Sequence, residues 1–359
     1  MKHEKILIAG AGLLIGMVAA LLVFFGNPGN MGFCIVCFIR DTVGGLGLDS
    51  AAAVQYIRPE IIGLVLGSFI AALIAKEFKP RGGSAPMTRF ILGAFMAVGA
   101  LMFLGCPFRM ILRLAGGDLN ALFGVLGFAG GILLGILFLN NGFSLKKSYA
   151  LGKGEGLIFP VFQGVLLLLV LIIPALFKFT EEGGGPGALH AAVIISLAAG
   201  LVVGALSPRT RMCMVGGIRD VVLFRDFKLL VGFFGVFAGA LLTNVILTMV
   251  TGGTYFKLGF SEQPIAHTDG LWNALGMLLV GFASVLLGGC PLRQLVLSGE
   301  GNSDSAVTVL GIGFGAAMAH NFGLASSAAG PTLSGKIAVV TGIIMTGVIA
   351  FVNSRNKKA

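Results

Sequence analysis

Charged residues are scarce in this chain of 359 residues: Asp, Glu, Lys and Arg together make up 11% of it, against roughly 25% in soluble domains. The hydrophobic residues reach 56%, glycine adds 57 residues, and the mean hydropathy is +0.98. A soluble globule, a disordered chain, a coiled coil, a collagen and a disulfide scaffold all have other compositions. A polytopic membrane protein remains, and its apolar runs are continuous, which indicates helices.

Other features that the chain lacks narrow its function. No phosphate-binding glycine loop or nucleotide-binding domain occurs, so we expect no ATP hydrolysis by this chain. The five cysteines are odd in number and none lies in a long polar segment, so we expect thiols in or near the membrane. His267 and His320 do not cluster with them in the sequence. We therefore predict no enzyme, no catalytic residues, no cofactor and no resident metal.

Ten apolar stretches approach the roughly 20 residues that a helix needs to cross a bilayer. Four shorter apolar segments remain and predict half-helices that return to the side from which they came. The expected spans are 5–25, 59–77, 88–105, 121–140, 157–177, 188–206, 229–250, 271–289, 306–323 and 336–353. The short segments are about 33–46, 107–115, 211–223 and 291–298. Glycine pairs such as Gly63/Gly67, Gly93/Gly99 and Gly127/Gly131 indicate tight contacts between helices.

The net charge of +10 predicts an orientation in the membrane rather than binding to nucleic acid, because Lys and Arg gather in short loops. If the short segments are re-entrant, a cytoplasmic N-terminus places these basic loops inside. Both termini are then cytoplasmic, which suits a multi-pass protein of the bacterial inner membrane. The inside residues are Lys2, Lys5, Lys76, Lys79, Arg81, Arg89, Lys146, Lys147, Lys153, Arg209, Arg211, Arg225, Lys228, Arg355, Lys357 and Lys358.

The chain contains an internal repeat. The segment from Cys34 to Asp41 (CIVCFIRD) matches the segment from Cys213 to Asp220 (CMVGGIRD), 179 residues later. The segments GCPFR, at 105–109, and GCPLR, at 289–293, match with an offset of 184. Each half has five spans, an odd number, so the second half enters from the opposite side. We predict two inverted transmembrane repeats, 1–180 and 181–359, an arrangement found in secondary transporters.

The repeated cysteines occupy the starts of the short segments. In Gly-Cys-Pro, proline suits the first turn of a helix and the cysteine takes the N-cap position. The free N–H groups and the dipole at that end attract an anion and favour a thiolate. Cys34, Cys106, Cys213 and Cys290 are therefore candidate substrate-binding residues. Close helix packing is the alternative role for them.

Further candidates are less symmetric. Cys37 matches Gly216 in the second half, and the Cys34-x-x-Cys37 motif also suits a soft metal or a redox pair. Arg109 and Arg293 each follow a cysteine by three residues, so they return to the same helix face. They either attract an anion or anchor the helix. The adjacent Arg-Asp residues, 40–41 and 219–220, predict structural pairs.

These motifs resemble those of the YeeE/YedE family of bacterial inner-membrane proteins over nearly the whole chain. That family includes thiosulfate uptake proteins and a branch associated with selenium transport, to which this chain is most similar. The resemblance implies that Cys34, Cys106, Cys213 and Cys290 pass a chalcogen-containing anion along through S–H hydrogen bonds. Cys37 has no counterpart in that pattern.

We therefore expect a transporter that imports a small sulfur- or selenium-containing anion along a cysteine-lined pathway. One alternative is a membrane carrier that hands persulfide or selenosulfide to a soluble acceptor. Others are a soft-metal permease that captures its ion at Cys34 and Cys37, and a structural subunit. The expected partners are the anion, membrane lipid and, at the cytoplasmic face, a soluble sulfur-carrier protein.

Overall fold

The computed structural model describes residues 2–355, apart from the side chains of Lys2, His3 and Arg355. Two of the basic residues used for orientation, Lys357 and Lys358, lie outside the described residues. The first half contains α1 (Lys2–Phe24), α2 (Ile35–Gly45), α3 (Pro59–Ile74), α4 (Pro86–Phe103), α5 (Pro107–Ala115), α6 (Asn120–Asn140) and α7 (Lys153–Ile172). Short elements join them: η1 (Ala52–Val54), β1 (Arg81–Gly82), β2 (Tyr149–Ala150) and η2 (Pro174–Leu176).

The second half repeats the order of long and short helices. It contains η3 (Pro186–Ala188), α8 (Val193–Thr210), α9 (Met214–Phe224), α10 (Lys228–Thr251), α11 (Gly270–Leu287), α12 (Pro291–Gly299), α13 (Ser303–Asn321) and α14 (Leu333–Arg355). Each expected span matches a long helix, and each expected half-helix matches α2, α5, α9 or α12. The all-α polytopic fold is confirmed, whereas the inverted relation of 1–180 and 181–359 stays a prediction.

Eight segments of the described chain are long and apolar enough to cross a membrane. Three of them run from a long helix into the short helix that follows it, namely α4 with α5, α8 with α9 and α11 with α12. The 16 residues of α3 are fewer than a perpendicular span needs. The polar residues at both ends of α13 reduce its hydropathy.

The long helices pack in pairs that each join the two halves. Helix α1 lies against α10, α3 against α8, α4 against α13, and α6 against α11. Glycines line these interfaces and bring the backbones close, as the glycine pairs in the sequence predict. The methyl group of an alanine at Gly131, for example, would overlap the Leu278 carbonyl of α11. The interface glycines are Gly12, Gly16, Gly235 and Gly239; Gly63, Gly67, Gly200 and Gly204; Gly93, Gly311 and Gly315; and Gly127, Gly131 and Gly281.

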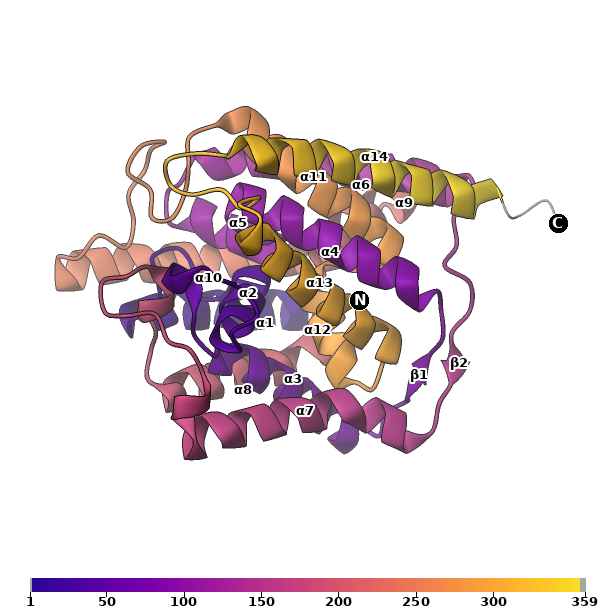
Figure 1. Ribbon diagram of the computed structural model, residues 1–359, viewed down its shortest axis with the longest axis horizontal. Coiled ribbons are helices and arrows are strands. Elements are labelled where there is room, and N and C mark those ends of the chain that lie inside the picture. Colours follow the sequence, from indigo (N-terminus) through magenta and orange to yellow (C-terminus); the bar gives the residue numbers. More distant parts are fainter. Residues whose placement is uncertain (1, 356–359) are drawn as a thin grey trace.

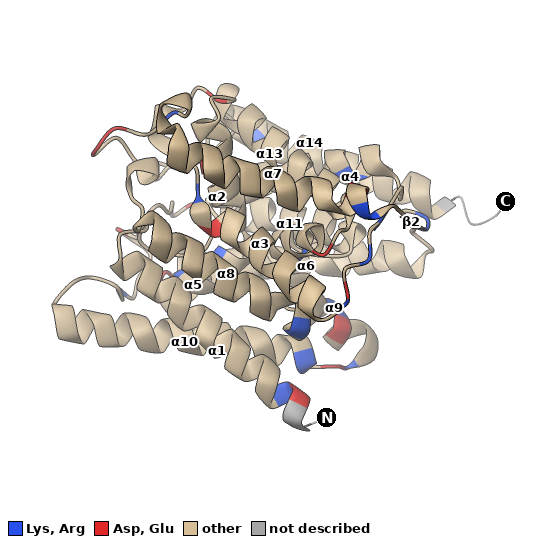
Figure 2. Ribbon diagram, turned by 90° about the horizontal axis from the view of Figure 1, so that it is seen from below, with Lys and Arg blue, Asp and Glu red and all other residues tan. Residues whose placement is uncertain are grey.

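The connecting loops gather at two opposite ends (Figure 1). One end holds the β1–β2 ladder, in which Arg81 pairs with Ala150, and the bridge from Arg81 to Asn302. The other end, on the left of Figure 1, holds the loops between α7 and α8 and between α10 and α11. Charged residues are sparse along the helices between these ends, with exceptions beside α2 (Figure 2). The exposed Lys and Arg side chains thus lie mainly toward the ends of the molecule (Figure 2), as in a protein that spans a membrane, whereas Arg40, Arg58, Arg109 and Arg113 are buried inside it.

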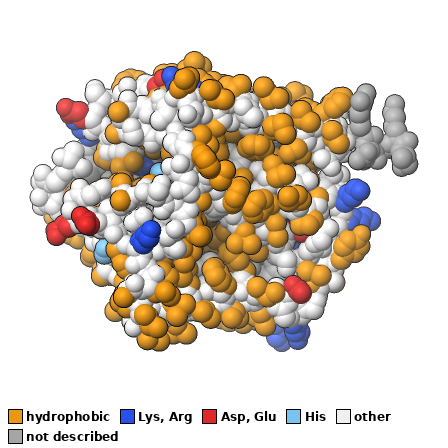
Figure 3. Space-filling model, viewed as in Figure 1, with side chains coloured by type: hydrophobic (Ala, Val, Ile, Leu, Met, Phe, Trp, Pro, Cys, Tyr) orange, Lys and Arg blue, Asp and Glu red, His pale blue; other side chains and the backbone are white. Residues whose placement is uncertain are grey.

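Large apolar side chains cover the outer face of the helices (Figure 3). On α7 they form a continuous stripe, and α14 presents a similar one on the opposite face of the molecule (Figure 1). Such a surface suits contact with lipid chains rather than water. The exposed residues of α7 are Ile158, Val161, Phe162, Val165, Leu168, Leu171 and Ile172.

Two neighbouring glycines of α6 test the packing between the halves. Gly131 abuts the α11 backbone, whereas an added methyl group at Gly130 meets nothing within 4 Å. We expect Gly131→Ala to reduce the free energy of unfolding by about 1–3 kcal/mol, because the backbone cannot yield. Gly130→Ala is expected to leave it unchanged or raise it slightly, because alanine favours helix. Thermal unfolding in detergent measures both, and equal effects would contradict the proposed interface.

Candidate functional site

Each of the four short helices begins directly after a cysteine. Cys34, Cys106, Cys213 and Cys290 are the N-cap residues of α2, α5, α9 and α12, all with extended backbone conformations. Proline follows two of them at the first helical position, as the Gly-Cys-Pro motifs predict. These thiols are therefore held where free backbone N–H groups are concentrated.

In the first half, three cysteines lie together at the starts of α2 and α5. The Cys34 Sγ accepts from the Cys37 N–H at 3.4 Å and from the Cys106 N–H at 3.5 Å. The Cys37 Sγ lies 2.7 Å from the Cys34 Sγ. All three are free thiols with at most 1% of their surface exposed. One sulfur thus receives N–H groups from two helix N-termini, an environment that stabilises negative charge.

The second half forms a matching pair at the starts of α9 and α12. The Cys213 Sγ accepts from the Gly216 N–H at 3.5 Å, as Cys34 does from Cys37. It also interacts with the thiol and the backbone N–H of Cys290. Both thiols are buried, with Cys213 6% exposed. The structure therefore brings Cys34 to Cys106 and Cys213 to Cys290, pairs that lie 72 and 77 residues apart in the sequence.

Cys37 has no counterpart in the second half, where Gly216 occupies the matching position. A Cβ on Gly216 would lie 2.8 Å from the Leu229 Cδ1 of α10. A cysteine there would force that side chain to move. The first half therefore carries a dithiol, and the second half carries one thiol at the equivalent helix start.

Arg109 extends the first cysteine cluster to a cavity. Its guanidinium is fully buried, donates to the Asn30 carbonyl at 3.1 Å and also to the Leu104, Pro264 and Ile265 carbonyls. Its Nη1 lies 4.0 Å from the Cys37 Sγ. In the described part of the chain, no carboxylate lies within ion-pair distance of it. A buried positive charge held by neutral atoms favours an incoming anion.

The cavity has a volume of about 310 Å³ and lies at the end of the molecule that carries the α10–α11 loop. Asn30 and Pro264 line it, and the carbonyls of both accept from Arg109. Lys257 and Glu262, which form an ion pair with each other, stand at the same cavity. The Lys257 ammonium holds the pKa of the exposed Glu262 carboxyl below its usual range. The polar lining continues with Asn244, Gln263, Thr254 and Tyr255.

Arg293 differs from Arg109 although it occupies the equivalent position. Its Nη1 lies 3.4 Å from the Glu300 Oε1, at the end of the same short helix, and both side chains are partly exposed. Its charge is therefore balanced by a carboxylate. Of the two roles left open for these arginines, the contacts of Arg293 suit anchoring and those of Arg109 suit anion binding.

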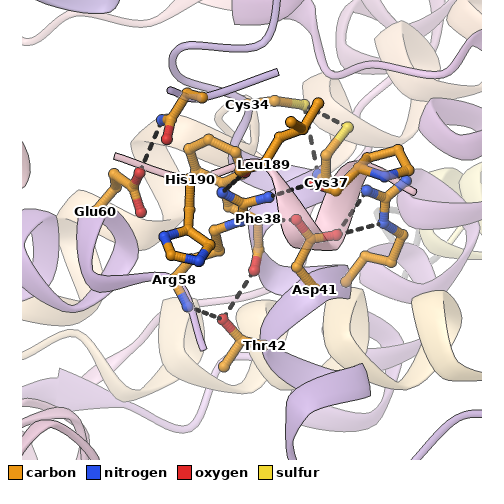
Figure 4. A network of polar contacts seen from close by, with 12 residues as sticks. Cys34, Cys37, Phe38, Asp41, Thr42, Arg58, Glu60, Leu189 and His190 are labelled. Atoms are coloured by element: carbon orange, nitrogen blue, oxygen red, sulfur yellow. Dashed lines mark hydrogen bonds and ion pairs between the residues drawn. The ribbon is translucent and has the colours of Figure 1, made fainter. Parts of the chain in front are cut away.

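Asp41 joins the cysteine-bearing helix α2 to its surroundings (Figure 4). Its Oδ1 accepts from Arg40 at 2.6 Å and its Oδ2 accepts from Arg58 at 2.7 Å. Arg58 also donates to the Leu189 and Pro186 carbonyls, both at 3.0 Å, in the loop before α8. This buried network ties α2 to α3 and to the second half. The expected structural role of the first Arg-Asp pair therefore fits its contacts.

The second Arg-Asp pair is simpler. Arg219 and Asp220 contact each other at 2.8 Å, with side chains 29% and 20% exposed. Arg58 is the N-cap residue of α3, and the residue at the same place before α10, the counterpart of α3, is Phe227. Among the described residues, α9 therefore has no buried ionic network like the one that holds α2.

The sequence analysis missed several polar residues of this region. Arg58 and Glu60 flank Pro59 at the start of an expected span, and both are fully buried. Charged residues at the edge of an apolar stretch were the available signal. Asn27, Asn30 and the buried Arg113–Asp118 pair, at 2.6 Å, carried no recognisable motif.

Fold and cysteine sites together define a polytopic helical membrane protein with thiols at internal helix N-termini. The model of a family described as sulphur transport matches residues 2–108 and 209–354, which is more than half of the chain. The chain belongs to this sulphur transport family, the family of the YeeE/YedE proteins. No curated protein matches the chain. Family and fold together indicate a sulfur-related membrane transporter.

The two aspartates test whether the halves are held differently. Asp41→Asn leaves two buried arginines without a carboxylate, which costs about 3–5 kcal/mol of unfolding free energy. Asp220→Asn breaks a partly exposed pair, for which we expect at most about 1 kcal/mol. Thermal or denaturant unfolding in detergent distinguishes them. A loss for Asp220→Asn as large as that for Asp41→Asn would contradict the structural role assigned to Arg58.

Proposed function

We propose that this protein imports a small sulfur- or selenium-containing oxyanion across the cytoplasmic membrane through its buried cysteines. One observation carries the proposal: in each half, two thiols meet where two helix N-termini converge. These positions offer N–H donors and polarizable sulfur to the same ligand. The arrangement suits an anion whose sulfur or selenium interacts with thiols.

The route begins at the cavity beside Arg109. The anion enters between Lys257 and Asn30 and meets the Arg109 guanidinium, which has no carboxylate partner among the described residues. Cys34, Cys37 and Cys106 receive it, and Cys290 and Cys213 pass it to the other side. A carboxylate or phosphate carrier would gain little from cysteine and would use Arg, Lys or Ser instead.

The orientation of transport follows from the positive-inside rule. The end of the molecule with β1 and β2 carries the basic loops and faces the cytoplasm in this proposal. The cavity beside Arg109 then opens to the outside. A soluble sulfur-carrier protein is the partner we propose at the cytoplasmic end. The similarity to the selenium-associated branch makes a selenium anion one of the two cargoes to test.

A covalent carrier is the second candidate, and Cys37 favours it. The Cys34 and Cys37 sulfurs lie 2.7 Å apart. A thiolate of this pair can attack the outer sulfur of thiosulfate, which forms a persulfide and releases sulfite, and an acceptor thiolate can then take the outer sulfur and release the cysteine. The soft-metal permease has less support, because the described residues contain no group of three or more Cys, His, Asp or Glu side chains arranged to hold a metal.

Uptake of labelled thiosulfate and selenite tests the proposal in cells without their own route for these anions. We expect wild-type protein to take up one of them, and Cys290→Ala or Cys106→Ala to reduce uptake at least tenfold. Serine variants separate the two mechanisms: partial activity indicates hydrogen bonding by S–H, and complete loss indicates covalent exchange. Uptake of neither anion, or uptake that is indifferent to both alanine variants, would refute the thiol pathway.

Arg109 and Arg293 provide a matched comparison for the anion route. Arg109→Gln removes a buried charge that no carboxylate balances, so we expect the apparent KM for the anion to rise by about tenfold or more. Arg293→Gln removes a charge that Glu300 already balances, and a change below about threefold is expected. Initial uptake rates over a range of anion concentrations measure both values. Equal effects would show that Arg109 has no special role in attracting the anion.

A further inference from the structure

Glu60, in the first turn of α3, is a fully buried carboxyl group (Figure 4). Its Oε1 accepts from the Asn27 Nδ2 at 2.8 Å and from the Ser196 Oγ of α8 at 2.9 Å. Its Oε2 has no hydrogen-bond partner, and no cationic group of the described chain lies within ion-pair distance. A buried carboxyl group of this kind inside a membrane protein marks a functional site by default.

Asn27 connects Glu60 to the first cysteine cluster. The two amide hydrogens of Asn27 go to the Glu60 Oε1 and to the Gly32 carbonyl, the latter at 3.1 Å. Its Oδ1 accepts from the Ala191 N–H at 2.8 Å, in the segment before α8. Gly32 precedes Cys34 by two residues. A change at the carboxyl group is therefore transmitted through one side chain to the segment that positions Cys34.

Buried charged groups of both signs lie in the same region as Glu60 and the first cysteine cluster. Arg40, Arg58 and Arg109 carry positive charges, and Asp41 and Asp49 supply negative ones. An anion bound at the cysteines adds negative charge to this low-dielectric region, and added negative charge favours the protonated form of a buried carboxyl group. Two other titratable groups, Tyr56 and His190, face Glu60, and their rings stack at 4.1 Å. The contacts from α8 and from the segment before α2, Ser196 and Asn27, do not titrate.

We propose that Glu60 binds one proton together with the transported anion, so that uptake of the anion is coupled to protons. This inference rests on the proposed function. An anion at the cysteines adds negative charge to the buried region, and the Glu60 Oε2, which has no hydrogen-bond partner among the described residues, then accepts a proton. Linkage makes the effect reciprocal, because a protonated Glu60 also strengthens anion binding.

The surroundings of Glu60 select a proton over a metal cation. Its Oε1 is already bonded to two hydrogen donors, and the amide nitrogen of Asn27 cannot be a cation ligand. Helix α10, the counterpart of α3 in the second half, contains no acidic residue. Helix α10 therefore offers no carboxyl group equivalent to Glu60.

Proton uptake on anion binding tests the inference with purified full-length protein in weakly buffered detergent solution. The probe is thiosulfate or selenite, whichever the uptake assay identifies, and a pH indicator reports the protons. We expect about one proton per anion bound by wild type and none by Glu60→Gln, which keeps the shape and accepts from Asn27. As the pH rises, the affinity of wild type for the anion is expected to fall by up to about tenfold per pH unit. In Glu60→Gln the affinity is expected to be independent of pH. The exposed Glu181→Gln serves as the matched control and is expected to behave as wild type.

Each outcome separates this inference from the proposed function. Anion binding without proton uptake, or with equal proton uptake in Glu60→Gln, overturns the role of Glu60 and leaves the transporter intact. Failure of wild type to bind either anion refutes the proposed function itself. If Glu60→Gln unfolds, the carboxylic C=O absorption of wild type decides the matter. An infrared band of a protonated acid that appears on adding the anion supports the inference, and its absence refutes it.

Discussion

Helix N-termini buried inside a membrane protein present N–H groups without partners, and this constraint governs the rest of the structure. Four short helices begin in the interior, and each begins after a cysteine. Sulfur is a weak acceptor, so a thiol only partly satisfies these N–H groups. The sites therefore retain an attraction for anions that a Ser or Asp cap would remove. The same positions thus serve both the fold and the proposed transport.

The two halves share a helix order but differ in charge. In the first half, α2 is held by Asp41, Arg58 and the loop before α8. This half also has the dithiol of Cys34 and Cys37, and Arg109, which has no carboxylate partner among the described residues. The second half has a single thiol at α9 and an arginine paired with Glu300. A pathway between such halves meets different thiols and charges at its two ends, although the order of helices is the same in both halves. This asymmetry suits a protein that accepts its cargo on one side and releases it on the other.

Much of this fold was predictable, because helices that span a membrane can be recognised in the sequence as long apolar stretches. The four half-helices were predictable as well, since each is an apolar segment too short to cross a membrane. The repeated motifs also identified the cysteines. The sequence did not predict the partners of Arg58, because its contacts at Pro186 and Leu189 lie more than 120 residues away. Glu60 was missed for the same reason, since Ser196 and Asn27 come from distant segments.

The sequence by itself determined the membrane class, the ten long helices, the four short ones and the identity of the thiols. Hydropathy and helix-start chemistry are local properties, so adjacent residues suffice to predict them. Only the tertiary structure decided three things: which thiols meet, that Arg109 donates to two residues of the cavity wall while Arg293 pairs with Glu300, and that one oxygen of Glu60 has no partner among the described residues. These properties depend on which distant groups share a low-dielectric interior, where one missing partner changes the charge that a site prefers.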